Sequence, residues 1–277
     1  MFQQLIDFKD ESETLYNLLA PLGDQDFGRK TQFKDWTIHD VIAHLHIFNW
    51  AAEESIRDGD SFVRFYEGLV KQRRDHGRSL IEATDLWLDE NEAGSRGRPL
   101  LLVWREFYLG MADRLADTDP KMRVKWAGPD MSVRSSLTAR LMETWAHAQE
   151  IFDMLGVERQ DEDRIKNIAV LGMNTFGWTF KNRGLDIPDD VPYVRLTAPS
   201  GETWEWNEPN TENCVSGSAT EFCQVVAQTR NIADTELVVM GDTAAHWMSI
   251  AQCFAGGPED PPAPGSRHVV SPEGIRA

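Results

Sequence analysis

The chain has 277 residues, 41% hydrophobic and 26% charged, which is typical of a globular protein with one large domain or two ordinary ones. Its net charge of −17 disfavours nucleic acid and anionic membranes as partners, because such a surface repels phosphate groups. The three cysteines are too few and too widely spaced for a disulfide framework, and the acidic N-terminal stretch lacks the apolar core of a signal peptide. We expect a cytoplasmic protein that acts on a small molecule, as a monomer or a homodimer.

The first two thirds of the sequence predict helices. Apolar residues recur with helical spacing in six segments, which Gly, Pro or clustered polar residues separate. The segments are 1–20, one that begins near Asp35 or Thr37 and ends at Gly59, about 61–92, 100–118, 133–156 and 161–184. Residues 119–132, between the fourth and the fifth segment, are expected to form a loop.

Residues 188–256 follow a different pattern. The short alternating stretches YVRLTA, ETWEWN and ELVVMG predict three strands, and two further stretches there predict helices. We therefore predict an α+β fold, with a helical bundle over 1–187 and a small α+β domain over 188–256. Residues 257–277 are rich in Pro and Gly and lack an apolar pattern, so they are expected to be disordered.

The stretch RLMETWAHAQEIF, residues 140–152, places charged side chains beside an apolar helix face. One stripe of this helix carries Arg140, Glu143, His147 and Glu150. Gln149 and Asp153 are expected on the side furthest from the core. A Glu-x-x-x-His pair on a helix can hold a metal ion, and an exposed ion pair between Glu143 and His147 is the alternative.

The second helix holds three of the seven histidines of the chain within eight residues. His44 flanks its apolar face on one side, and His39 and His46 flank it on the other. One histidine of this helix, together with Glu143 and His147, would complete a three-ligand set, which leaves positions on the ion open for water or substrate. The alternative is that His44 is a core histidine bonded to a backbone carbonyl, with His39 and His46 in solvent.

Two motifs, taken together at their spacing, indicate a resemblance to a known family. DWTIHDVIAHLHIFNWA, followed after about ninety residues by ARLMETWAHAQEI, resembles the DinB/YfiT-like metal-binding superfamily. The nearest branch is that of the mycothiol-dependent maleylpyruvate isomerase-like proteins, in an actinobacterial-type subfamily described as metal-binding proteins or wyosine base formation domains. This resemblance implies a four-helix bundle whose divalent ion, often zinc, is held by His44, Glu143 and His147.

The resemblance also implies an activity. A zinc ion with open positions would activate a low-molecular-weight thiol, mycothiol or glutathione, for an isomerase or S-transferase reaction on a small unsaturated acid. The first alternative is a metal-dependent hydrolase of a small amide, ester or thioester, in which Glu150 would serve as the base. The second alternative is a protein that binds a metal or a ligand without catalysis.

Further residues are candidates for the substrate and the ion. Arg140, one turn before Glu143, is the first candidate for an anionic substrate, with a plain salt bridge as its alternative. Arg230, at the end of a helix in the small domain, is the second candidate. Trp126 and Met131, in the loop before the ligand helix, are expected to wall a pocket. Glu150 is expected either to accept the N–H of the last histidine or to be exposed.

The cysteines are expected to have no catalytic role. Cys223 and Cys253 lie in apolar helical stretches, which is typical of buried, inert thiols. A reactive sulfur would then have to come from a cosubstrate.

Overall fold

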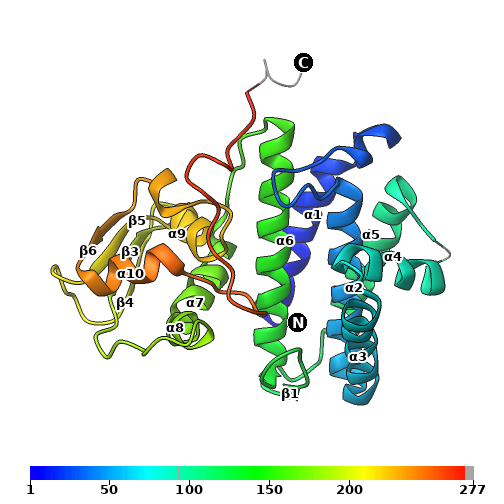
Figure 1. Cartoon of the computed structure of the whole chain (residues 1–277), viewed down its shortest axis with the longest axis horizontal. Coiled ribbons are helices and arrows are strands. Elements are labelled where there is room, and N and C mark those ends of the chain that lie inside the picture. The colour runs from blue at the N-terminus through cyan, green and yellow to red at the C-terminus, as the bar shows by residue number, and fades with distance from the viewer. Residues whose placement is uncertain (93, 272–277) are drawn as a thin grey trace. The chain divides into compact units, whose positions relative to one another are not determined.

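The computed structural model describes residues 1–92 and 94–271, which form two compact units that divide between Ile151 and Phe152. The first unit is mainly helical, and the second combines helices with a small sheet (Figure 1). This confirms the predicted α+β fold class, with a helical bundle first and a small α+β unit after it. Among the described residues, no helix has the length and apolar character needed to cross a membrane.

The first unit is built around one buried helix, α2 (Ile38–Arg57). The other helices of this unit are α1 (Gln3–Leu19), α3 (Gly59–His76), α4 (Leu80–Asn91), α5 (Gly97–Arg114) and α6 (Val133–Leu155), with the 3₁₀ turn η1 (Asp24–Gly28) after α1. Helix α2 packs against α3, α4 and α5, and α5 packs against α1. A run of fully buried apolar side chains on α2 anchors this packing, among them Val41, Ile42 and Leu45.

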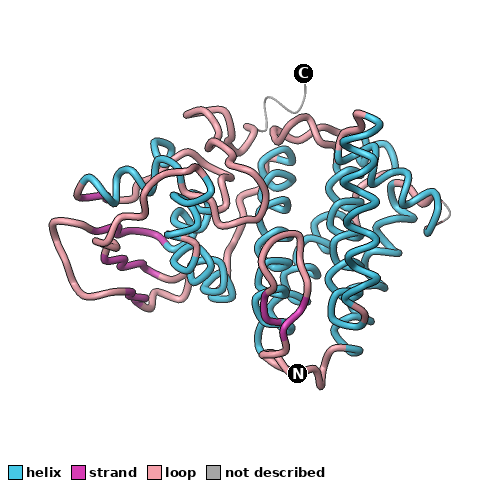
Figure 2. Tube along the Cα trace, turned by 60° about the horizontal axis from the view of Figure 1, so that its bottom comes forward, coloured by secondary structure: helices cyan, strands magenta, loops and turns pink. Residues whose placement is uncertain are grey.

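Two elements of this unit differ from the sequence prediction. The predicted helix over about 61–92 is two helices, because Gly77 adopts a left-handed backbone (φ +65°) that ends α3. Ser79 then caps α4, accepting a hydrogen bond from the backbone N–H of Glu82. The expected loop over 119–132 contains a small antiparallel pair, β1 (Arg123–Val124) and β2 (Met131–Ser132), which leads directly into α6 (Figure 2).

The second unit contains a four-stranded sheet with the order β4-β3-β5-β6 (Figure 2). Its strands are β3 (Tyr193–Thr197), β4 (Thr203–Trp206), β5 (Cys214–Ser218) and β6 (Val238–Met240), and its helices are α7 (Lys166–Asn174), α8 (Phe176–Asn182), α9 (Ala219–Val226) and α10 (Asp242–Ile250), with the 3₁₀ turns η2 (Asp163–Ile165) and η3 (Ile232–Asp234). Strand β3 pairs antiparallel with β4 and parallel with β5, which pairs antiparallel with β6. Strand β5 was missed by the sequence analysis, because CVSGS offers a single β-branched residue.

The boundary between the units lies between Ile151 and Phe152, whereas the sequence analysis placed it near residue 187. The reason is that α7 packs against α9 and α8 against α10, so these two helices belong with the sheet. The predicted disorder of the tail is wrong for residues 257–271, which make specific hydrogen bonds: Asn231 donates to the carbonyl of Pro262, and the Gly265 N–H donates to Asp234. Residues 272–277 lie outside the described part of the chain.

Candidate metal centre

The first ligand is positioned by the capped start of α2. Thr37 accepts a hydrogen bond from the backbone N–H of Asp40 (3.1 Å), and the Asp40 carboxylate accepts one from the backbone N–H of Thr37 (2.8 Å). This capping box is worth about 1 kcal/mol to the helix and fixes where its first turn begins. His44 follows two turns later on the same rigid helix and is 8% exposed.

A tight turn before α2 brings aromatic side chains to this region. Lys34 and Asp35 have left-handed backbones (φ 49° and 59°), and the Trp36 N–H donates to the Phe33 carbonyl (2.9 Å). Two successive positive φ values closed by this bond are the signature of a type I′ turn. Side chains other than Gly and Asn adopt this backbone at a cost of about 1 kcal/mol or more per residue. The turn presents Phe33 and Trp36 together.

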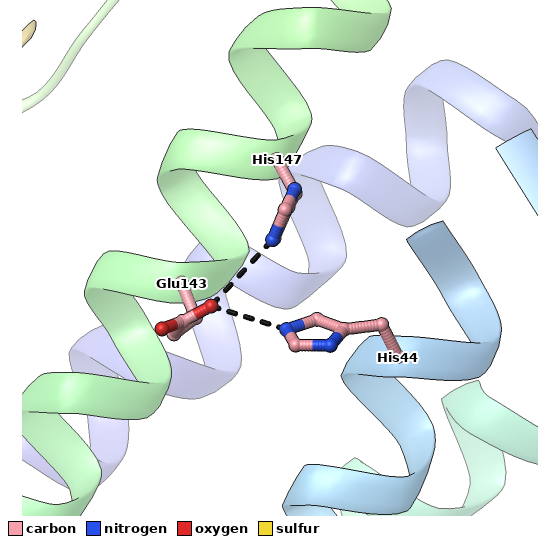
Figure 3. A group of neighbouring side chains, drawn as sticks. All are labelled: His44, Glu143 and His147. Atoms are coloured by element: carbon pink, nitrogen blue, oxygen red, sulfur yellow. Dashed lines mark hydrogen bonds and ion pairs between the residues drawn. The ribbon is translucent and has the colours of Figure 1, made fainter. Parts of the chain in front are cut away.

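The other two ligands lie on α6, one helical turn apart. Glu143 and His147 point from α6 toward His44 of α2 (Figure 3). Oε2 of Glu143 lies 3.1 Å from Nε2 of His44 and 3.5 Å from Nε2 of His147. One donor atom from each of the three residues lies within 4.8 Å of the other two. The histidine of α2 is thus bonded to a carboxylate and not to a backbone carbonyl, and the alternative of an exposed Glu–His pair is wrong because His147 is 8% exposed.

Electrostatics give His44 and Glu143 the protonation states that a metal ion needs. Burial lowers the pKa of His44 to about 4, although the hydrogen bond to Glu143 opposes the shift. Burial by itself raises the pKa of Glu143, but hydrogen bonds from His147 and His44 outweigh it and hold this pKa well below its usual range. At neutral pH, His44 is therefore neutral and Glu143 is charged, as metal ligands must be.

Aromatic rings enclose the two ligand histidines. Trp36 stacks on His147 with ring centroids 5.3 Å apart and an interplanar angle of 12°, and it also contacts His44 at 5.3 Å. Phe33 meets His147 edge-on at 5.1 Å, and Phe48 contacts His44 at 4.8 Å. These contacts hold both imidazoles in place and exclude water from their sides. The sequence analysis did not assign Phe33 or Trp36 to the site, although Trp36 lies within its first motif.

The donor set fits one zinc ion. Zinc bonds to nitrogen and oxygen ligands are about 2.0–2.1 Å long, so tetrahedral zinc holds its donors about 3.4 Å apart. The distances from Oε2 of Glu143, 3.1 Å to His44 and 3.5 Å to His147, bracket that value, and all three donor atoms lie within 4.8 Å of one another. Two imidazole nitrogens and one carboxylate oxygen are also the ligands of many catalytic zinc sites, which keep a further position open. The triad is therefore a candidate catalytic metal centre.

The remaining charged residues of the α6 stripe are buried. Arg140 is 2% exposed, and its Nε donates to Oδ1 of Asn49 on α2 (3.0 Å). The predicted salt bridge of Arg140 to Glu143 or Glu150 does not form within 4.0 Å among the described residues. Glu150 is 1% exposed, so the alternative of an exposed glutamate is wrong. Asp153, expected on the outer side of the helix, is fully buried.

The residues proposed to wall a pocket lie away from the triad. Trp126 stacks on Phe62 at the start of α3, with centroids 5.2 Å apart. The carbonyl of the preceding Lys125 accepts a hydrogen bond from Ser55 of α2. Ser55 lies three turns, about 16 Å, along the helix from His44. Met131 pairs with Val124 in the same hairpin, so the structure does not bring either residue to the ligands.

Arg230 is bound within the second unit. Its two terminal nitrogens donate to both carboxylate oxygens of Asp153, each over 2.7 Å, and one of them also donates to the Thr229 carbonyl. Both residues are buried, with Asp153 at 0% and Arg230 at 8% exposure. A bidentate pair of this kind gives the guanidinium its hydrogen-bond acceptors and orders the chain segment that follows α9.

The other two histidines of α2 have different partners. His46 is fully buried, with Nε2 3.1 Å from Glu92, and burial lowers its pKa. His39 lies 3.5 Å from Asp85. The prediction that His46 lies in solvent is therefore wrong, and neither residue shares a carboxylate with the triad.

Comparison with known proteins places this arrangement in a family. The fold and the triad define a helical-bundle protein with a candidate metal centre between two of its helices. A model of the family described as mycothiol maleylpyruvate isomerase N-terminal domain matches residues 8–152, and the chain belongs to this family. Two uncharacterized proteins of Mycobacterium tuberculosis, from strains CDC 1551 and H37Rv, are each 33% identical to it over 254 residues, which are 91% of this chain and 95% of the relative.

A solved structure shares the architecture. The crystal structure of a mutant of the mycothiol-dependent maleylpyruvate isomerase matches with a TM-score of 0.50 and 16% identity, over 81% of this chain and 88% of that chain. At this identity the likeness shows the fold. The predicted membership of the maleylpyruvate isomerase-like branch is thereby confirmed.

Proposed function

We propose that the chain is a zinc enzyme that uses a low-molecular-weight thiol to act on a small unsaturated acid, as an isomerase or S-transferase. The observation that carries the proposal is the convergence of His44, Glu143 and His147 from two helices onto one point. Family membership supports a thiol cosubstrate, since the related structure is that of a mycothiol-dependent enzyme. Mycothiol is therefore the first thiol to test, and glutathione the second.

Each ligand residue has a defined task. His44 and His147 offer imidazole nitrogens, and Glu143 offers the negative charge that offsets part of the charge of a divalent ion. Zinc bound there supplies Lewis acidity, which lowers the pKa of a thiol or water molecule in its open position. Phe33, Trp36 and Phe48 shield the imidazoles from water, and this lower local polarity strengthens every electrostatic interaction at the ligands.

The reaction we propose needs no oxidant or reductant. The thiolate sulfur forms a bond to one carbon of a cis double bond, and the electron pair of that double bond moves toward the conjugated carbonyl. Rotation about the resulting single bond follows. Loss of the thiolate then breaks the carbon–sulfur bond and restores the double bond in the trans form, so the thiol is regenerated. In an S-transferase reaction, the thiolate would instead replace a leaving group and remain in the product.

The cysteines of the chain support an external source of sulfur. Cys223 is fully buried, and burial raises the pKa of its thiol well above the usual value. Cys253 is also buried, and none of the three cysteines forms a disulfide among the described residues. A buried neutral thiol is a poor nucleophile. Free thiols also support our proposal of a reducing, cytoplasmic location.

The test combines metal analysis with a thiol panel. Purified protein should contain near-stoichiometric zinc, and His147→Ala should lose it. His39→Ala, a histidine on the same helix as His44 but outside the triad, is the matched control and should keep the metal. The cis–trans isomerisation of maleylpyruvate is then followed with mycothiol, with glutathione and without thiol. Turnover that requires a thiol and fails in His147→Ala supports the proposal.

The other outcomes point to the alternatives. Hydrolysis of an amide, ester or thioester without any thiol would favour a metal-dependent hydrolase, for which the buried Glu150 is the candidate base on the ligand helix. Bound zinc without turnover across the panel would indicate a binding protein. Protein that retains no zinc after gentle purification would refute the metal centre itself.

A further inference from the structure

A second polar group lies beside the metal ligands, between α2 and α6. Arg140 is 2% exposed, and its Nε donates to Asn49, which is fully buried. Its Nη2 is buried and has no hydrogen-bond partner among the described residues. No carboxylate of the described residues lies within ion-pair distance of the guanidinium. The Glu143 carboxylate, one helical turn away, acts on Arg140 through its charge but does not pair with it directly. A buried arginine without a direct ion pair is rare, because burial of a charge costs several kcal/mol.

Two further donors in this group also lack partners in the described part of the chain. Nδ2 of Asn49 and Oγ of Ser136 are buried and make no hydrogen bond there. Ser136 lies four residues before Arg140, so the two side chains share one face of α6. The amide of Asn49 is held against the guanidinium by its own oxygen. Three unsatisfied donor groups thus gather at one place, and they require an acceptor.

This donor cluster, Asn49, Ser136 and Arg140, continues the polar stripe of the metal ligands. Arg140 precedes Glu143 by one turn on the same face of α6. The ring of Phe48 contacts both groups, with its centroid 4.8 Å from that of His44 and 6.0 Å from the Arg140 guanidinium carbon. A carboxylate held by the cluster would therefore lie about one helical turn from the metal ligands.

The chemistry of the cluster selects a carboxylate. A guanidinium presents parallel N–H groups that match the two oxygens of a carboxylate, and the amide N–H and the hydroxyl supply further donors. In a chain with a net charge of −17, an acidic substrate also needs a local cation to overcome repulsion. Water would satisfy the hydrogen bonds but would leave the charge unpaired.

We propose that Asn49, Ser136 and Arg140 form the subsite for the carboxylate of the substrate. The inference rests on the proposed function and deepens it, because it makes the substrate an acid held by its carboxylate beside the metal. Asn49 and Arg140 are then residues that determine specificity for acids over neutral analogues.

The test measures binding rather than turnover. Maleate, a short unsaturated dicarboxylate, is titrated calorimetrically into the zinc-loaded full chain, and its uncharged diamide is the control ligand. The key variant is Asn49→Asp, which has the same shape but puts a carboxylate against Arg140 and so occupies the subsite from within. We expect at least a tenfold weaker affinity for maleate, the effect of losing one charge-assisted hydrogen bond. Arg140→Met should give a similar loss, and Ser136→Ala a smaller one.

Two controls separate the possible failures. Arg114→Met removes an arginine that pairs with Glu53 on the surface of the bundle and should leave maleate binding unchanged. Zinc content should equal that of the wild type in all variants. If the wild type holds no zinc, the proposed function fails, and maleate binding to the metal-free chain still tests the subsite.

Affinities of Asn49→Asp and Arg140→Met within twofold of the wild type would overturn the proposal. So would a wild type that does not discriminate between maleate and the diamide, because the cluster would then hold only buried water.

Discussion

Acid should destabilise the metal-free protein through His44 in a pH range that can be calculated. The unfolded chain protonates this histidine near pH 6.5, whereas burial lowers its pKa in the folded protein to about 4. Between these values the unfolded state binds one more proton than the folded state, so the free energy of unfolding falls as the pH falls. The contribution of His44 is fully present above pH 6.5 and is lost progressively toward pH 4.

The magnitude follows from one proton. Each pH unit in this range is worth about 1.4 kcal/mol, so acidification from pH 6.5 to pH 5 should cost about 2 kcal/mol. Glu143 adds to the loss only at lower pH, because its pKa lies well below the usual range and its contribution persists until it is protonated. His46, whose pKa burial also lowers, contributes in the same direction between pH 5 and pH 6.5, so a variant of His44 is needed to isolate its share.

The assay is urea unfolding of chelator-treated protein at several pH values, for the wild type and for His44→Gln. The glutamine removes the titrating group and keeps a polar side chain at this position. Between pH 6.5 and pH 5, the difference in unfolding free energy between the two proteins should change by about 2 kcal/mol, because the unfolded wild type binds one more proton than its folded state. A difference that stays flat over this range would refute the reasoning, because His44 would then titrate alike in both states.

Three further predictions follow from other parts of the chain. Glu143→Gln removes the charge of one ligand. Zinc at 100 times the wild-type Kd should raise the unfolding free energy of the wild type in urea by about 2.7 kcal/mol, and that of the variant by less than about 1 kcal/mol. Equal stabilisation would exclude Glu143 as a ligand. The double variant Lys34→Asn, Asp35→Gly places residues that favour a type I′ turn at its two central positions, so its unfolding free energy should rise by about 1 kcal/mol. A fall in unfolding free energy would contradict the assigned turn. Arg230→Met removes the bidentate partner of the buried Asp153 and should cost about 3–5 kcal/mol, most of which the double variant with Asp153→Leu should restore. A stable single variant with impaired substrate binding would instead support the substrate role suggested by the sequence.

The local parts of the site could be predicted from the sequence. The spacing of Glu143 and His147 fixes them on one face of a helix, and Thr37 followed by Asp40 predicts the start of α2. The approach of His44 to Glu143, 99 residues away, depends on helix packing that no local pattern encodes. The resemblance to a known family supplied that contact, whereas the residue types alone left it open.

Other features depend on tertiary packing and were missed for that reason. The pattern of charged residues on α6 predicted an outer face, but Asp153 is buried in an ion pair with Arg230, 77 residues later in the chain. The helix break after α3 depends on one glycine within an otherwise continuous pattern. The contact of Trp36 with both ligand histidines depends on a turn formed by Lys34 and Asp35, which are not the residues that usually favour such a turn.

The metal-free geometry constrains how tightly the site can hold an ion. Glu143 accepts hydrogen bonds from Nε2 of both imidazoles, so these nitrogens have a partner in the absence of metal, whereas Nδ1 of His44 has none among the described residues. An ion must replace these bonds, each worth about 1.5–3 kcal/mol when one partner is charged, before it gains its own. The site is thereby stable without metal and already close to the geometry that zinc needs. Nη2 of Arg140 has no partner among the described residues either, so a second unsatisfied group lies one turn away from the metal centre.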